Sequence, residues 1–306
     1  MLQLDAATVL LQWATGGMLF CWFTTRRREV GLGYGWLLRG TYLLLALGAL
    51  LLGLRFEVVP GREIAAAGVV LSCAVVLGVS IVRRSAGVSG QRAEHDRRTA
   101  RVAAMTGIDR ASASSAGGAG GERAGSLAAR APTTRGPIKE FPPVLDLVPV
   151  VIGAAGLVFA AVAATAGDAS VAVAILRTLV GAAFLGAVTD AMLLGHWYLV
   201  QPGLPRRLLN EIVTALGWVW PFQIAVMLLP PGMISVFTGA IDDGWGGVLG
   251  WMWAACAITT IVLVFVTKAA LREREYSAVM AATGLLYLAI LTAFGTDLVA
   301  RAVLGG

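Results

Sequence analysis

Residues 6–25 read AATVLLQWATGGMLFCWFTT, a run of 20 residues without a charged side chain. A helix needs about 20 mostly apolar residues to cross a hydrocarbon layer of roughly 30 Å. Helices suit this environment because they satisfy their backbone hydrogen bonds internally. The stretch therefore predicts a transmembrane helix, and similar runs recur along the chain.

The composition extends this conclusion to the whole chain. Its 306 residues are 58% apolar and 14% charged, with a mean hydropathy of +0.78. An ordinary soluble domain is roughly 45–50% apolar and about 25% charged. The difference excludes a soluble enzyme, a disulfide-stapled secreted module and a disordered regulator. We expect an all-α, polytopic integral membrane helical bundle, with the lipid bilayer as its surroundings.

Seven further apolar runs bring the number of predicted spans to about eight. The second run contains a single Arg39, and the sixth is interrupted by Pro230 and Pro231, which predict a helix followed by an outer loop. The further runs cover residues 33–54, 64–82, 147–167, 170–200, 212–241, 244–267 and 276–296.

A charged linker separates the third and fourth spans. Residues 83–140 contain eleven basic and five acidic side chains, and residues 112–121 read SASSAGGAGG. So few large apolar residues predict a disordered cytoplasmic loop over residues 84–143. It divides the chain into a three-span part, residues 1–83, and a five-span part, residues 144–306. The positive charge predicts attraction to anionic lipid headgroups. It does not predict nucleic-acid binding, because no aromatic residues are interleaved with it.

The basic residues also predict the orientation. Cytoplasmic loops of membrane proteins carry an excess of Lys and Arg. Loops that alternate along the chain carry this excess, whereas the loops between them are balanced or acidic. We therefore expect an inner (plasma) membrane protein with both termini outside and the linker in the cytoplasm. The basic positions are Arg26, Arg27, Arg28, Arg206, Arg207, Lys268, Arg272 and Arg274, together with the linker.

The most polar part of the spans is DAMLLGHWYLVQPGLP, residues 190–205. A charged side chain in a span costs roughly 2.5–3.5 kcal/mol on insertion scales. If the fifth span ends near Val200, Asp190 lies roughly 15 Å deep and His196 roughly 6 Å deep. One interpretation is a ligand or proton site open to the cytoplasm, with Trp197 and Tyr198 as walls. The other is an ordinary interfacial aromatic belt.

Other polar residues in the spans give weaker candidates. Arg39 and Glu211 lie about 8 Å from the same face. Arg39 could form a structural ion pair with Asp190, whereas Glu211 could compensate a helix N-terminus. Asp297 and Arg301 have the i, i+4 spacing of a helical ion pair and predict a self-neutralising anchor at the outer end of the last span.

The sixth and seventh spans carry several tryptophans. Around the helix-kinking Pro221, the residues Trp218, Trp220 and Gln223 are candidates for lining a cavity near mid-membrane. Ordinary packing of a kinked helix explains the same pattern.

The ligand inventory limits the cofactors. The chain has two histidines, and His95 lies in the linker, so one chain cannot hold a haem between two histidines inside the bilayer. Haem is thus a weak hypothesis, and no metal site is expected. The three cysteines are scattered through apolar runs and predict buried apolar side chains. A quinone is the one cofactor for which the polar group around His196 gives an argument.

The sequence is consistent with three functions, and it does not decide whether the chain is an enzyme. The first is a redox-linked membrane subunit that binds quinone or another amphiphile through Asp190, His196, Trp197 and Tyr198. The second is a proton-coupled transporter or permease with Asp190, Arg39 and Glu211 along its path. The third is a structural or assembly subunit of a membrane complex, with other subunits as partners.

Overall fold

The computed structural model describes residues 5–88, 140–165, 170–201, 203–230, 232–273 and 275–304. These residues form helices and connecting turns without a strand, and eight of the helices are long and apolar enough to cross a membrane. The predicted fold class is confirmed. The helices are α1 (Ala6–Thr25), α2 (Leu32–Arg55), α3 (Pro60–Val82), η1 (Arg83–Ala86), η2 (Pro143–Asp146), α6 (Leu147–Ala164), α7 (Val171–Val200), α8 (Arg207–Leu228), α9 (Met233–Phe237), α10 (Val248–Ala270) and α11 (Tyr276–Leu304).

Several helix ends differ from the predicted spans, for local reasons. The helix α8 ends at Leu228, before the proline pair, and the short α9 replaces the rest of the predicted sixth run. The helix α11 continues to Leu304, because Asp297 and Arg301 neutralise each other inside it. Pro221 lies within α8.

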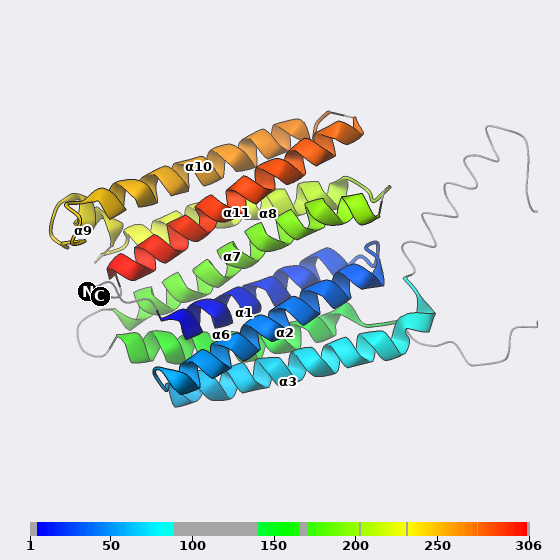
Figure 1. Ribbon diagram of the computed structural model, residues 1–306, viewed down its shortest axis with the longest axis horizontal. Coiled ribbons are helices and arrows are strands. Elements are labelled where there is room, and N and C mark those ends of the chain that lie inside the picture. Colours follow the sequence, from blue (N-terminus) through cyan, green and yellow to red (C-terminus); the bar gives the residue numbers. More distant parts are fainter. Residues whose placement is uncertain are drawn as a thin grey trace, which may run out of the picture.

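The eight long helices form two rings of four (Figure 1). In the first ring, α1 contacts α2 and α6, and α3 contacts α2 and α6. In the second ring, α7 contacts α8 and α11, and α10 contacts α8 and α11. The rings meet where α1 and α6 of the first contact α7 of the second. Both rings therefore have the same order of antiparallel helices, and α6 packs with the three N-terminal helices although it follows the linker.

The two ends of the bundle are distinct. Figure 1 places the N- and C-termini at one end, which we call the termini end, and the end of α3 at the other, which we call the linker end. Arg27 reaches Glu211 at 2.7 Å at the linker end, and Arg207 pairs with Glu29. The basic loops predicted to share one side thus share one end of the bundle; Arg274 lies outside the described residues.

Most of the predicted linker, residues 89–139, lies outside the described residues. Its described edges correct the predicted boundaries of disorder. Arg83–Ala86 forms a 3-10 helix after α3, and Phe141 is buried. Glu140 pairs with Arg28 at 2.9 Å. These residues are ordered because they bind the bundle.

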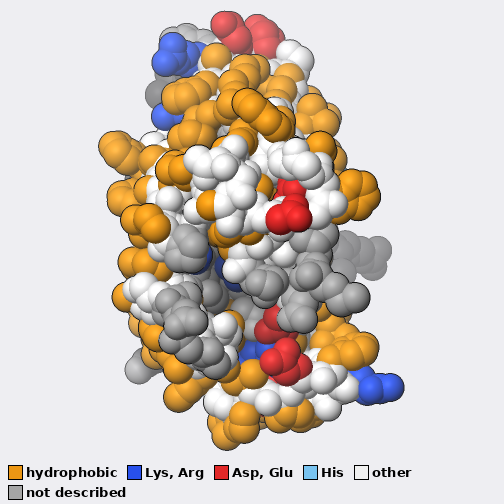
Figure 2. All heavy atoms as spheres, turned by 90° about the vertical axis from the view of Figure 1, so that its left-hand side faces the viewer, with side chains coloured by type: hydrophobic (Ala, Val, Ile, Leu, Met, Phe, Trp, Pro, Cys, Tyr) orange, Lys and Arg blue, Asp and Glu red, His pale blue; other side chains and the backbone are white. Residues whose placement is uncertain are grey.

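The outer surface of the bundle is apolar. Leu44, Ile64 and Trp251 are 66%, 74% and 71% exposed. Water would disfavour so many large exposed apolar side chains, whereas lipid tails accept them. The surface therefore supports a bilayer environment. At the termini end, Figure 2 shows acidic and basic side chains scattered among hydrophobic ones.

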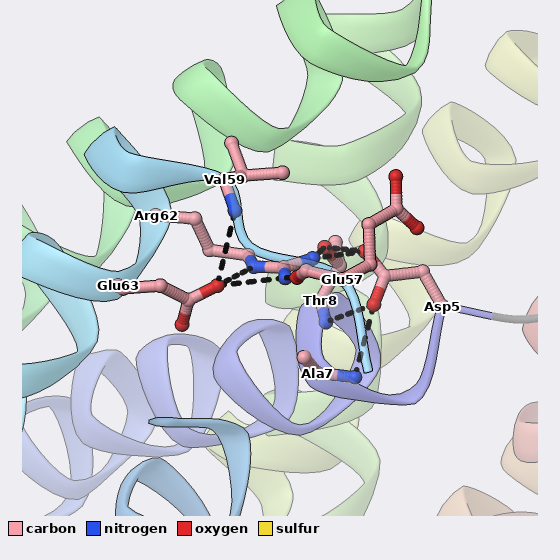
Figure 3. A network of polar contacts seen from close by, with 7 residues as sticks. All are labelled: Asp5, Ala7, Thr8, Glu57, Val59, Arg62 and Glu63. Carbon is pink, nitrogen blue, oxygen red and sulfur yellow. Dashed lines mark hydrogen bonds and ion pairs between the residues drawn. The ribbon is translucent and has the colours of Figure 1, made fainter. Parts of the chain in front are cut away.

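A buried arginine organises the termini end (Figure 3). Arg62 is 1% exposed and donates to Glu63 Oε1 from Nε at 2.9 Å and from Nη2 at 2.7 Å. It also pairs with Asp5, which caps α1 by accepting from the backbone N–H groups of Ala7 and Thr8. The network fixes the start of α1 against the start of α3.

The crossing of α1 and α7 depends on glycine. A Cβ atom at Gly16 would lie 1.7 Å from the carbonyl oxygen of Ala182, and one at Gly186 would lie 2.1 Å from the carbonyl carbon of Gly16. No side chain fits at such distances. Small residues let helix backbones approach this closely in a membrane, so the two rings meet backbone to backbone.

The loop before α10 is held by Asp243, outside the spanning segments. Its Oδ1 accepts from the backbone N–H groups of Gly247 at 2.8 Å and Trp245 at 2.9 Å, and Oδ2 accepts from Leu249 at 2.9 Å. The Gly247 bond, followed by the others, holds the pKa of the Asp243 carboxyl below its usual value. The side chain thus caps α10 as an anion.

Gly16→Ala should lower the thermal midpoint in lipid or detergent, because the added methyl group forces α1 from α7. Overpacking of this kind costs about 1–3 kcal/mol. Gly78→Ala is the matched control, since a Cβ atom there meets nothing within 4 Å. Equal midpoints for the two variants would contradict the proposed close crossing.

The Asp243 loop should loosen in acid. A pKa lower in the folded than in the unfolded state (about 3.9) gives stabilisation that is present above that unfolded value and is lost as the pH falls through the folded one. Hydrogen exchange of the amides of residues 245–249, corrected for intrinsic rates, should show this loss of protection. Asp243→Ala should lack protection at neutral pH, whereas Asp242→Ala should behave as the wild type. Acid-independent protection would disprove the assignment.

Candidate functional site

The deepest acidic side chain of the linker-end half of the spans is Asp190 on α7. It is fully buried, and the hydroxyl of Tyr42 on α2 donates to its Oδ1. Its Oδ2 has no hydrogen-bond partner among the described residues. Nor does any described Lys, Arg or His form an ion pair with it. Asp190 therefore lies between the two rings with one neutral donor.

Arg39 does not pair with Asp190, which corrects the ion pair considered from the sequence. It binds Asp146 in a two-pronged geometry, with Nε to Oδ1 and Nη2 to Oδ2 both at 2.7 Å. Its Nη1 lies 3.3 Å from Ser80 Oγ, and the guanidinium lies 4.4 Å from the centre of the Phe141 ring. Both charged groups are almost fully buried, and the fork of Arg matches a carboxylate.

Asp146 is a residue that sequence reasoning missed. It directly precedes the fourth apolar run, so a count of charges inside spans leaves it out. The signal was the spacing of one Arg inside the second span and one acid at the mouth of the fourth, at the same predicted side. Tyr42, three residues after Arg39, also drew no attention because tyrosine is unremarkable in a span.

His196 is separated from Asp190. It is exposed on the outside of α7, where Nδ1 lies 3.3 Å from the hydroxyl of Tyr287 on α11. Six residues along a helix turn a side chain well away from the first one, so Asp190 faces α2 while His196 faces α11 and lipid. The structure does not bring these two candidates together in one pocket.

The aromatic residues next to His196 hold the turn between α7 and α8. Trp197 Nε1 donates to Gln201 Oε1 at 3.1 Å, and its ring lies 5.8 Å from the Tyr34 ring. The hydroxyl of Tyr198 donates to the carbonyl of Pro205 at 2.7 Å. These bonds position the helix ends and leave the aromatic groups little freedom to line a pocket.

Glu211 lies at the surface of the linker end. Its carboxylate is 2.7 Å from Arg27 Nη1 and 3.8 Å from Arg26 Nη2, with 30% of its side chain exposed. Glu211 links α8 to the arginines that follow α1, and these ion pairs do not involve Asp190.

The three residues of α8 that were predicted to line one cavity have different surroundings. Trp218 is 69% exposed and faces outward, while Trp220 Nε1 donates to the carbonyl of Ala257 on α10 at 3.0 Å. Gln223 is fully buried and donates from Nε2 to Asp297 Oδ1 at 3.0 Å. The three side chains therefore point in three directions, and Gln223 belongs to a polar group around Asp297 that does not include Asp190.

That second polar group lies toward the termini end. Asp297 accepts from Arg301 Nε at 2.7 Å, which confirms the predicted i, i+4 pair. Asp297 is nevertheless fully buried, so the pair is part of the bundle interior and not only an anchor. Gln12 of α1 is also fully buried, and neither atom of its amide group has a partner among the described residues.

The described residues contain no group of three or more His, Cys, Asp and Glu side chains that could hold a metal ion. Cys21, Cys73 and Cys256 are free thiols on the spans. The arrangement offers hydrogen bonding and proton binding as its chemistry.

Removing one member of the Arg39–Asp146 pair should destabilise the protein more than removing both. Arg39→Met leaves Asp146 buried without its partner, and losing one partner of a buried pair costs about 3–5 kcal/mol. Adding Asp146→Leu should recover much of this loss, because the double variant buries no charge. Thermal unfolding of the single and double variants measures the coupling. Additive losses would contradict the pairing.

No model of a known protein family, no curated protein and no solved structure matches the chain. What is shown of its class therefore rests on its own helices, which are those of a multi-pass membrane protein.

Proposed function

We propose that the chain is a proton-coupled membrane carrier and that Asp190 is its proton-binding site. One observation carries this proposal: a carboxyl group is fully buried between two helix rings with a neutral tyrosine hydroxyl as its donor. Structural acids elsewhere in the bundle, Asp146 and Asp297, each lie against an arginine. Asp190 differs from both.

The surroundings of Asp190 favour its protonated form. An isolated carboxylate is very costly to bury, and such a group takes up a proton instead. Tyr42 supplies one hydrogen bond to Oδ1, while Oδ2 is free to carry the proton. Losing that proton would require water or a cation to approach. Ionisation of Asp190 is thus tied to a change in its surroundings, which is the requirement for coupling.

The arrangement of the rings supports a carrier. Asp190 belongs to α7 in one ring, and Tyr42 belongs to α2 in the other. Transporters built from parallel repeats place coupling sites near the midplane, where their halves meet. Movement of one ring against the other would separate Asp190 from Tyr42 and admit water to the carboxyl group.

A quinone-binding subunit is the second candidate, favoured by the His196–Tyr287 contact. Both side chains lie on the outer surface, where an amphiphile dissolved in lipid can reach them. This site does not include Asp190. The two candidates therefore depend on different residues and separate in one experiment. A role as an assembly subunit would depend on neither residue.

We further propose that the linker end faces the cytoplasm of an inner membrane and that both termini lie outside. The arginine-rich loops at that end support this orientation through the positive-inside rule. Their charge also supports contact with anionic lipid headgroups.

Asp190→Asn should abolish an infrared absorption band of a protonated carboxyl group that the wild type keeps at neutral pH in lipid vesicles. The reason is that the amide replaces the only buried acid of the described spanning helices that has no cationic partner. The same substitution should stop proton uptake driven by an imposed membrane potential. Both signals are measured on the full chain in vesicles.

His196→Phe is the control, because its side chain is exposed and remote from Asp190. It should leave the carboxyl band and proton uptake unchanged. A wild type that lacks the Asp190 band would overturn the proposed function. Loss of ubiquinone-analogue binding in His196→Phe, with no effect of Asp190→Asn, would favour the second candidate instead.

A further inference from the structure

A second group of buried polar side chains lies where α1, α7, α8 and α11 meet. Gln12, Gln223 and Asp297 are each fully buried. Asp297 accepts from Gln223 Nε2 at 3.0 Å and from Arg301 Nε at 2.7 Å. We call Gln12, Gln223, Asp297 and Arg301 the glutamine cluster. It lies roughly 10 Å from the termini end, since Asp297 is seven residues before the end of α11.

The glutamine cluster has unused hydrogen-bonding capacity. The nitrogen and oxygen of the Gln12 amide and the Oε1 of Gln223 have no partner among the described residues. Leaving such atoms bare inside a protein costs about 1–3 kcal/mol each. The free groups include both donors and acceptors, so a small neutral molecule that does both fits them. Water is the smallest such molecule, and buried waters typically make about three hydrogen bonds to groups of this kind.

Gly181 on α7 makes the convergence of these side chains possible. A Cβ atom there would lie 2.2 Å from Gln12 Nε2, 2.7 Å from Asp297 Oδ1 and 3.0 Å from Arg301 Nη2. The polar atoms of α1 and α11 thus come together over a bare stretch of α7 backbone. The sequence shows this group only as separate residues on three helices.

The glutamine cluster and Asp190 share the helix α7. Gly181 and Asp190 are nine residues apart, which is roughly 13 Å along a helix. Between them, Trp13, which follows Gln12 in α1, donates from Nε1 to Thr189 Oγ1 at 2.9 Å, and Thr189 is next to Asp190. The close packing of Gly16 against Ala182 and Gly186 occupies the direct route. Passage between the two groups therefore requires α1 and α7 to move apart.

We infer that the glutamine cluster binds water and gives protons access to Asp190 from the termini end. This inference rests on the proposed function, because it assigns the route to the same proton site. Water held by Gln12 and Gln223 would deliver a proton toward Asp190 Oδ2 when the α1–α7 crossing opens. Asp297 accepts from Arg301 Nε and from Gln223 Nε2, so it holds the amide of Gln223 in place.

The test is the rate at which the Asp190 carboxyl exchanges its proton for deuterium. Transfer of vesicles into heavy water shifts the infrared band that Asp190→Asn identifies. In Gln12→Leu the exchange should slow by about tenfold or more, the factor expected when a buried polar contact of about 1.4 kcal/mol is lost. Proton uptake should slow in parallel.

Thr292→Val is the matched control. Thr292 lies on α11, as Asp297 and Arg301 do, but its hydroxyl accepts from Thr260 Oγ1 on α10 at 2.8 Å and lies outside the glutamine cluster. In Thr292→Val, the Asp190 carboxyl should exchange its proton at the wild-type rate. Gln223→Leu is the second variant and should slow exchange as Gln12→Leu does.

The possible outcomes are distinct. Wild-type exchange rates in both glutamine variants would overturn the inference while leaving the proposed function standing. Absence of an Asp190 band in the wild type would overturn the proposed function itself. If neither glutamine variant folds, an experimental structure of the wild type that resolves water decides: water bonded to Gln12 and Gln223 supports the inference, and a dry, ordered cluster overturns it.

Discussion

The cost of placing polar and charged groups in lipid governs this bundle. Arg39, Arg62 and Arg301 are each held by at least one carboxylate, so their charges enter the interior as neutral units. Apolar side chains fill the core and also cover the outer surface, where a soluble protein would place polar ones. Arg39 and Arg62 thereby link different segments through Asp146 and Asp5, whereas Arg301 neutralises Asp297 within α11. Asp190 is the acid to which this rule does not apply.

Two glycines let the rings approach each other closely where α1 crosses α7. Gly16 and Gly186 bring the backbones of α1 and α7 together, and the polar groups at Asp190 and at Gln12 lie on either side of this crossing. Small residues allow helix backbones to pack this closely in a membrane. In the proposed proton route, this crossing would have to open before water could pass between the two polar groups.

The number and type of helices followed from the sequence because each span needs a long uncharged run. The sharing of one bundle end by the basic loops followed from their alternation. Helix neighbours could not be predicted, since nothing in an apolar run states which other run it packs against. That is why the partner of Arg39 was missed, and why α6 joins the N-terminal helices in space.

The candidate site, too, was predictable from the sequence only where it does not depend on helix packing. Asp190 stood out because a deep acid is costly wherever its helix packs. Helical rotation alone turns Asp190 and His196 apart, but only the positions of α2 and α11 decide what each one meets. Gln12 and Gln223 are uncharged, so their importance depends on convergence over Gly181, which is a property of the packing.

The most direct measurement of the central claim is the carbon-13 chemical shift of the Asp190 side-chain carboxyl in lipid bilayers, assigned by comparison with Asp190→Asn. We predict the shift of a protonated acid at neutral pH, well above the range in which exposed aspartates titrate. The shift of an ionised carboxylate at that pH would contradict the account, because it would mean that the charge has a partner or solvent that this structure does not provide.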